Sequence, residues 1–216
     1  MRQLAGLILL GVLAWSTPLV SQPAIYRVSP ADSYIHVYTD TAGALGRFSH
    51  KHLVAITRIQ GQISISPEGQ SARLVIRPED FLVDDDSERA RAADPEFREP
   101  VSKDIQTDTK RNMLGPRLLD VQQYPEIEVT VQLEKLSSSP LLDVSVHVLG
   151  EKRSLQIPAI LQVDKQRLGV TGYFELRHAD LGLQPYTAMG GLLRVADQLR
   201  VQFEISAEAT STANSD

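Results

Sequence analysis

Cysteine is absent from the 216 residues of this chain. Disulfide bonds, thiol catalysis and cysteine-ligated zinc or iron–sulfur centres are therefore excluded, and stability must come from the burial of apolar surface. Aromatic residues amount to only 6%, which argues against a platform on which nucleic-acid bases stack. The net charge is -5, with acids and bases interspersed. We expect no nucleic-acid partner, because such partners need a basic surface.

Sequence signatures of catalysis are also missing. The chain contains no Gly-x-Ser-x-Gly turn, no phosphate-binding Gly-Lys-Ser/Thr loop and no dinucleotide-binding Gly-x-Gly-x-x-Gly. The acids in the segment 126–134 alternate with apolar residues, so we expect them on the solvent face of a strand. These features favour a protein that is not an enzyme and that carries no cofactor.

Long apolar runs are confined to the N-terminus. A positive start precedes the apolar segment Leu4 to Trp15, which is followed by Pro18 and by small polar residues near Ser21. This layout is typical of a secretory signal peptide, and the run is shorter than the roughly 20 residues that span a membrane. We predict a signal peptide at 1–21 and a mature protein that is periplasmic or secreted. The alternative is an uncleaved anchor.

What the sequence does contain is strict alternation of apolar and polar residues over its C-terminal half. Five runs, at 127–133, 142–148, 155–163, 168–176 and 199–207, place apolar side chains at every second position. That period indicates half-buried strands of an antiparallel sheet. Closing such a sheet into a barrel hides both its apolar face and its edges. We predict an all-β antiparallel barrel of about eight strands, a size that can leave room for one small ligand.

The N-terminal half adds shorter strand patterns and one interruption. Gly61 lies inside the strand-like segment 48–65, which predicts a bend or a close backbone approach. Residues 78–100 lack periodicity, and the segment 101–114 has the spacing of a helix that ends at Gly115-Pro116. We therefore expect a small helical excursion within one domain, residues 25–208, followed by a flexible polar tail at 209–216.

Several motifs in this order resemble the YceI-like family of exported lipid-binding proteins. They are Val28-Ser29-Pro30-Ala31-Asp32-Ser33, Phe48-Ser49-His50-Lys51-His52-Leu53 followed by Gly61, Leu118 to Ile127 with its Asp-Val-x-x-Tyr-Pro-x-Ile core, the Gly150 turn, and Asp180-Leu181-Gly182. The resemblance implies a lipocalin-like barrel with an elongated apolar interior that holds a polyisoprenoid chain.

On this reading the protein sequesters or carries a long apolar lipid. Apolar surface removed from water contributes roughly 25 cal/mol per Å², so such a chain needs few polar contacts. Alternation alone does not distinguish a hollow barrel from a filled one. The residues that we expect to contact the lipid, the first of them near an entrance, are Phe48, Val129, Val131, Val144, Val146, Ile157, Val170, Phe174 and Phe203.

Two other functions compete with this one. His50 and His52 share a face of a strand, so both imidazoles could bind one metal ion. A third ligand could come from His36, His147 or His178. That arrangement would make the protein a secreted metal-dependent enzyme, although we expect no bound metal. An adhesion or partner-binding module is the other alternative, and an exposed apolar patch would reveal it.

Charged residues gather around the helical excursion. We expect the acids Asp84, Asp85 and Asp86 to form a solvated loop, because the spacing does not fit a calcium-binding loop. We expect the basic residues from Arg89 to Arg111 to be mostly surface charge. The alternative is that they meet an anionic head group or the phosphates of a membrane during a transient contact.

Overall fold

Antiparallel strands are the main regular structure in the computed structural model, which describes residues 23–46 and 49–210. The N-terminal strands are β1 (Ala24–Val28), β2 (Tyr34–Ala42), β3 (His52–Ile56), β4 (Gln60–Ser66), β5 (Gly69–Ile76) and β6 (Leu82–Val83). The C-terminal strands are β7 (Ile127–Leu133), β8 (Leu141–Val148), β9 (Glu151–Pro158), β10 (Ile160–Val163), β11 (Arg167–Arg177), β12 (Thr187–Ala188) and β13 (Leu193–Ala209).

Helices occupy the middle of the chain and some of the turns. The two α-helices are α1 (Asp86–Ala90) and α2 (Lys103–Leu114), and the 3-10 turns are η1 (Pro30–Asp32), η3 (Pro78–Asp80), η4 (Pro95–Phe97), η5 (His178–Leu181) and η6 (Met189–Gly191). The predicted helix at 101–114 is thus present from residue 103, and Gly115 forms its C-cap as expected. The short helix α1 was not predicted. It begins because the Asp85 carboxylate accepts hydrogen bonds from the backbone N–H groups of Ser87 and Glu88.

The sheet closes because two strands change partners along their length. β13 pairs with β11 on one side, and on the other side it pairs first with β2 and then with β1. β9 pairs with β8, and β10 pairs with β11, although only Ala159 separates β9 from β10. Pro158 is the last residue of β9; beyond it the N–H groups of Ala159 and Leu161 donate to the carbonyls of Pro140 and Ser138, while β10 pairs with β11. Each of these strands therefore joins the two halves of the sheet.

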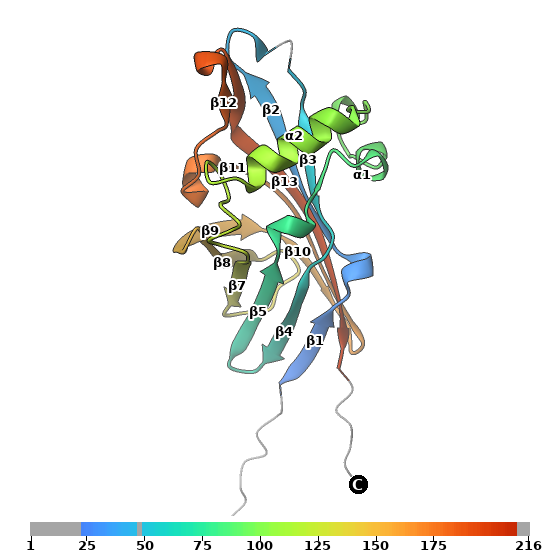
Figure 1. Cartoon of the computed structure of the whole chain (residues 1–216). Coiled ribbons are helices and arrows are strands. Elements are labelled where there is room, and N and C mark those ends of the chain that lie inside the picture. The colour runs from blue at the N-terminus through green and yellow to red at the C-terminus, as the bar shows by residue number, and fades with distance from the viewer. Residues whose placement is uncertain (1–22, 47–48, 211–216) are drawn as a thin grey trace, which may run out of the picture.

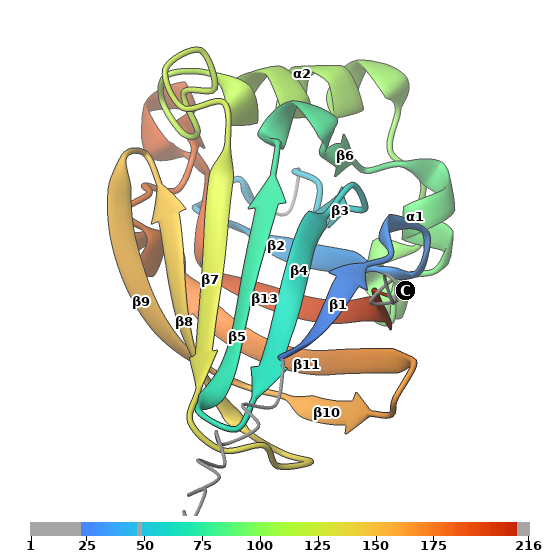
Figure 2. The same cartoon turned by 90° about the horizontal axis from the view of Figure 1, so that it is seen from below.

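A closed circuit results, running through β11, β13, β1, β4, β5, β7, β8 and the combined β9–β10. Within the described residues it makes an antiparallel barrel of about eight strands, which confirms the predicted fold class. Figure 2 shows its two sides, with β1, β4, β5 and β7 crossing in front of β2, β13 and β11. Such crossing of the two sides leaves a space between them that side chains must fill or a ligand can occupy.

The strand segment predicted at 48–65 is two strands, β3 and β4, joined by a short connection. Gly61 in β4 lies where a Cβ would overlap the carbonyl oxygen of Arg73 on β5. The close backbone approach expected at this glycine is therefore present. At the other end of the chain β13 continues to Ala209, which is paired with Tyr26, so the ladder reaches the first residue of the predicted tail.

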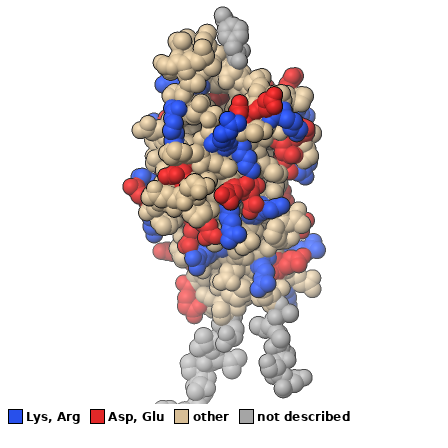
Figure 3. Space-filling view, viewed as in Figure 1, with Lys and Arg blue, Asp and Glu red and all other residues tan. Residues whose placement is uncertain are grey.

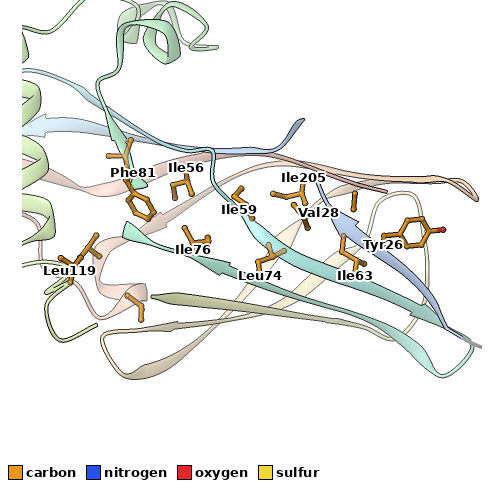
Figure 4. Packing of buried hydrophobic residues seen from close by; sticks show 14 of the residues in the cluster. Tyr26, Val28, Ile56, Ile59, Ile63, Leu74, Ile76, Phe81, Leu119 and Ile205 are labelled. Carbon is orange, nitrogen blue, oxygen red and sulfur yellow. The ribbon is translucent and has the colours of Figure 1, made fainter. Parts of the chain in front are cut away.

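Apolar side chains line the interior of the barrel from end to end, as Figure 4 shows from Phe81 and Leu119 near α2 to Tyr26 at the opposite end. In Figure 1, α2 lies across one end of the lower strands, and β2, β12 and the start of β13 extend beyond it. No helix in residues 23–46 and 49–210 is long and apolar enough to cross a membrane. The predicted signal peptide lies outside the described residues.

Candidate ligand-binding cavity

A cavity of about 350 Å³ lies inside the barrel, and strands from both of its sides line it. Its volume is within the range of small-molecule binding sites. Most of the residues that we expected to contact a ligand line this cavity, and Phe48 lies outside the described residues. The residues in question are Val129, Val131, Val144, Val146, Ile157, Val170, Phe174 and Phe203.

Register explains why these side chains meet. Val131 on β7 is paired with Ala72 on β5 and with Val144 on β8, and Val144 is paired with Leu155 on β9. Paired residues of neighbouring strands point to the same face. A continuous apolar row therefore runs across four strands, and a second row, two residues along, contains Val129. The apolar positions of the alternating sequence pattern therefore form the wall of the cavity.

A missing side chain shapes the opposite wall. Gly172 on β11 is paired with Phe203 on β13, and a Cβ at Gly172 would lie 2.5 Å from the Phe203 ring. The ring of Phe203 also packs edge-on against Phe174, with 6.2 Å between centroids. The glycine thus gives the phenyl ring space to lie against the β11 backbone.

The two ends of the cavity differ. Near α2 it is covered by Met113, Leu118, Leu119 and Phe81, most of which also pack against the main apolar core. Away from α2 the lining includes Leu136, which follows β7 and is 46% exposed. The cavity therefore reaches the surface near the connection between β7 and β8, at the end distant from the helix.

Charged side chains are absent from the described part of the cavity wall. Its polar residues are Thr39, Gln70, Ser71 and His178, and the His178 Nδ1–H donates to the carbonyl of Asp197 at 2.9 Å. The Gln70 Nε2 donates to the carbonyl of Ser66, while its Oε1 is buried without a hydrogen-bond partner in the described residues. Such a wall suits a neutral, predominantly apolar molecule, because a buried charge without a partner is strongly unfavourable.

Outside the barrel wall, a buried ionic cluster holds the helical excursion against β3. Asp84 is completely buried, and its Oδ1 accepts hydrogen bonds from the Leu53 N–H at 2.9 Å and from Arg89 Nη1 at 2.5 Å. Its Oδ2 lies 2.6 Å from His52 Nδ1. Arg89, also buried, donates further to the carbonyls of Lys51 and Glu99. The predicted solvated loop is therefore wrong at Asp84, and the predicted surface charge is wrong at Arg89.

Tertiary contacts explain why Asp84 and Arg89 are buried and not at the surface as predicted. A fully buried carboxylate is stable only with partners. Besides Arg89 of α1, the partners here are His52 and Leu53 of β3, which the sequence alone does not place beside the loop. Nearby basic residues do remain at the surface, where Lys103 pairs with Asp86 and Arg111 with Asp108.

A second buried pair joins α1 to β2. The His36 Nε2 lies 3.0 Å from Glu88 Oε2, and both side chains are almost fully buried. Burial lowers the pKa of His36, an effect that the hydrogen bond to Glu88 opposes. Sequence reasoning treated His36 as a spare metal ligand and missed this role. The sequence feature that could have indicated this role is the position of His36, which shares one face of a strand with Tyr34 and Tyr38.

The arrangement does not assemble the competing metal site. His52 is bound to Asp84, which also holds Arg89, while His50 is exposed. In the part of the chain that the structure describes, no three side chains of His, Cys, Asp or Glu converge as metal ligands would. His52 therefore belongs to the packing of the excursion against β3.

The fold and the cavity together define a lipocalin-like barrel built around an apolar interior. The sequence profile of the YceI-like domain matches residues 26–207, so the chain belongs to the YceI-like family, and the resemblance noted from its motifs is confirmed. No curated protein sequence matches the chain.

Solved structures share this fold at low sequence identity. A polyisoprenoid binding domain from Saccharophagus degradans is 14% identical, with a TM-score of 0.57 over 86% of this chain and 98% of that one. BcnA of Burkholderia cenocepacia is 12% identical, with a TM-score of 0.58 over 83% of this chain and 99% of that one. The YceI protein of Campylobacter jejuni is 11% identical, with a TM-score of 0.51 over 73% and 85%.

Proposed function

We propose that this protein binds a long apolar lipid of the polyisoprenoid class inside its barrel and carries or sequesters it outside the cytoplasm. The observation that carries the proposal is the cavity wall, which is formed by apolar side chains of many strands and has no charged member among the described residues. A relative with the same fold is a polyisoprenoid binding domain, which supports this class of ligand.

The binding energy in this proposal is hydrophobic. Each buried CH2 group contributes about 0.8 kcal/mol, so a five-carbon isoprene unit contributes about 4 kcal/mol before the costs of ordering the chain. Several units would bind without a polar anchor. The protein has no catalytic role in this proposal, since binding requires only the fit between the cavity wall and the lipid.

Direct chemical analysis tests the proposal. Protein purified under native conditions without detergent is extracted with organic solvent, and the extract is analysed by mass spectrometry. We expect a stoichiometric isoprenoid lipid. A matched extract from the unfolded and refolded protein should contain none and should regain it when the lipid is added. Absence of any lipid from the native protein, together with failure of the refolded protein to bind one, contradicts the proposal.

The site of action is a separate part of the proposal. The charged start and short apolar run at the N-terminus support export, with cleavage near Ser21. We expect N-terminal sequencing of protein from the periplasm or the medium to begin close to this residue. Intact Met1 in a membrane fraction would instead support an uncleaved anchor.

A further inference from the structure

One end of the molecule forms an apolar projection, here called the tip, made of residues 41–46 and 186–195. The β13 residue Arg194 is paired with Ala42 on β2 and with Thr187 on β12. The N–H of Leu45 donates to the carbonyl of Leu192 at 3.1 Å, which ties the turn after β2 to the turn before β13. Figure 1 shows this end beyond α2, at the top of the view.

Large apolar side chains are exposed at the tip. Met189 is 63% exposed and Leu192 is 48% exposed. Between them lie Gly190 and Gly191, with φ of 64° and 90°, and a Cβ at either glycine would meet no neighbouring atom. In Figure 3 the described surface beside the grey residues at the top of the view is tan, whereas charges of both signs cover the body below it. The tip therefore presents apolar surface that the described residues leave uncovered.

The charge around the tip differs from that of the whole chain. Although the protein has 27 acidic and 22 basic residues, the segments 41–46, 109–119 and 181–196 contain no Asp or Glu. Basic residues are present there, including Arg194 in the tip and Arg117 beside it. Neither forms an ion pair with a carboxylate of the described residues.

Arg117 is held against the tip by two contacts. Its Nη2 donates to the carbonyl of Thr187 at 3.3 Å, and its guanidinium lies 5.0 Å from the centre of the Tyr186 ring. A cation beside an aromatic ring and exposed apolar side chains is the combination that favours the interface of an anionic bilayer. Neutral or acidic residues in these positions would not complement the negative charge of such a bilayer.

The tip is also continuous with the cavity. Leu181 and Leu183 line the cavity and precede Tyr186 in the same segment, and Leu118, which follows Arg117, lines it as well. The covering of the cavity near α2 and the base of the tip are thus built from the same two stretches of chain. The residues of the tip are therefore close in sequence to residues that cover the cavity.

We propose that the tip docks on the surface of a bilayer that contains anionic lipid, with Met189 and Leu192 inserted between head groups and Arg117 and Arg194 facing phosphates. The inference rests on the proposed function, because docking there would place the cavity next to the source or destination of its lipid. The body of the barrel stays in water.

Vesicle flotation tests this inference. The purified full chain is mixed with vesicles of phosphatidylcholine alone or with 30 mol% phosphatidylglycerol, a fraction of roughly one anionic lipid in three that gives a negative surface. We expect binding to the anionic vesicles that weakens with salt, because exposed charges are screened. Met189→Ser with Leu192→Ser should weaken binding roughly tenfold or more, from the apolar area removed. Arg194→Gln should weaken it roughly fivefold and only on anionic vesicles.

A matched control has equally exposed apolar residues elsewhere. Leu141 is 53% exposed and Ile160 is 55% exposed, and neither lines the cavity or belongs to the tip. Changing both to Ser should leave vesicle binding at the wild-type level. Since the N-terminal apolar run is common to all variants, the difference between the two pairs reports the tip alone. Equal loss of vesicle binding in the tip variant and the control variant, or no loss in the tip variant, overturns the inference.

Bound lipid is measured on the same samples, so that the two proposals fail separately. If the tip pair retains its lipid and still binds vesicles as the wild type does, docking at the tip is wrong while lipid binding stands. If the wild type contains no lipid but shows tip-dependent vesicle binding, docking stands and the proposed cargo is wrong. Tip-dependent self-association without vesicles, measured by sedimentation, would assign the surface to a second copy of the chain and overturn the inference.

Discussion

Substitution of Val131 by Trp distinguishes a hollow barrel from a filled one. Val131 and Val144 are paired across β7 and β8, and both line the cavity. Val144 is almost fully buried, whereas Val131 retains exposed surface, although it faces the interior. A tryptophan at Val131 therefore has free space to enter, and one at Val144 does not.

The expected stability effects follow from packing. Overpacking a filled site costs about 1–3 kcal/mol, so Val144→Trp should lower Tm by about 2–12 °C for a domain of this size. Val131→Trp should leave Tm nearly unchanged. Gln132→Trp is the matched control, because Gln132 neighbours Val131 and is exposed on the outer face of the barrel. It should change neither stability nor binding.

The effect of Val131→Trp on lipid binding should differ from its effect on stability. An indole ring in the cavity takes the place of part of the lipid, and losing contact with one isoprene unit costs at most about 4 kcal/mol. We expect Val131→Trp to retain less lipid in organic extracts and to bind an added isoprenoid more weakly, while thermal unfolding remains cooperative. If Val131→Trp is destabilised as strongly as Val144→Trp and the wild type holds no lipid, the interior is filled and the reasoning is refuted.

Three further predictions concern stability. Asp84→Ala leaves the buried Arg89 without a carboxylate to balance its charge and should lower the free energy of unfolding by about 3–5 kcal/mol in a denaturant titration. Gly61→Ala forces a Cβ onto a backbone oxygen of the adjacent strand and should lower it by about 1–3 kcal/mol, measured in the same way. The pKa of His36 is lowered by its burial, so the unfolded chain takes up this proton more readily than the folded protein. The contribution of His36 to the free energy of unfolding is therefore fully present above the unfolded pKa of about 6.5. It declines as the pH falls below that value. Thermal unfolding at a series of pH values should show this decline, and His36→Gln should reduce it.

Matched controls accompany these variants. Asp86→Ala removes an exposed ion pair with Lys103 and should cost less than about 1 kcal/mol. Gly169→Ala places its Cβ where no atom lies within 4 Å, so it should be tolerated. A cost for Asp84→Ala as small as that of Asp86→Ala would contradict the buried cluster. A His36→Gln variant that loses stability with falling pH just as the wild type does would contradict the role given to His36.

Local sequence determined the strands and the faces of the strands. The alternation at 127–133 and 142–148 specified which side chains of β7 and β8 face inward, because successive residues of a strand point to opposite sides. The Gly115-Pro116 pair likewise ended α2 where expected, since proline cannot continue a helix. The order of the motifs in the sequence indicated the YceI-like family, and the matched domain confirms it.

Tertiary structure decided closure, burial of charge and the space inside. Closure depends on β9 and β10 pairing with different neighbours on either side of Ala159, which no local pattern encodes. Asp84 looks like a solvated acid in the sequence, and it is buried because folding brings it to β3 and to Arg89. Alternation specifies which residues face the interior but not whether they touch across it, because that depends on the distance between the two walls. The cavity therefore became visible only when the strands were placed in space.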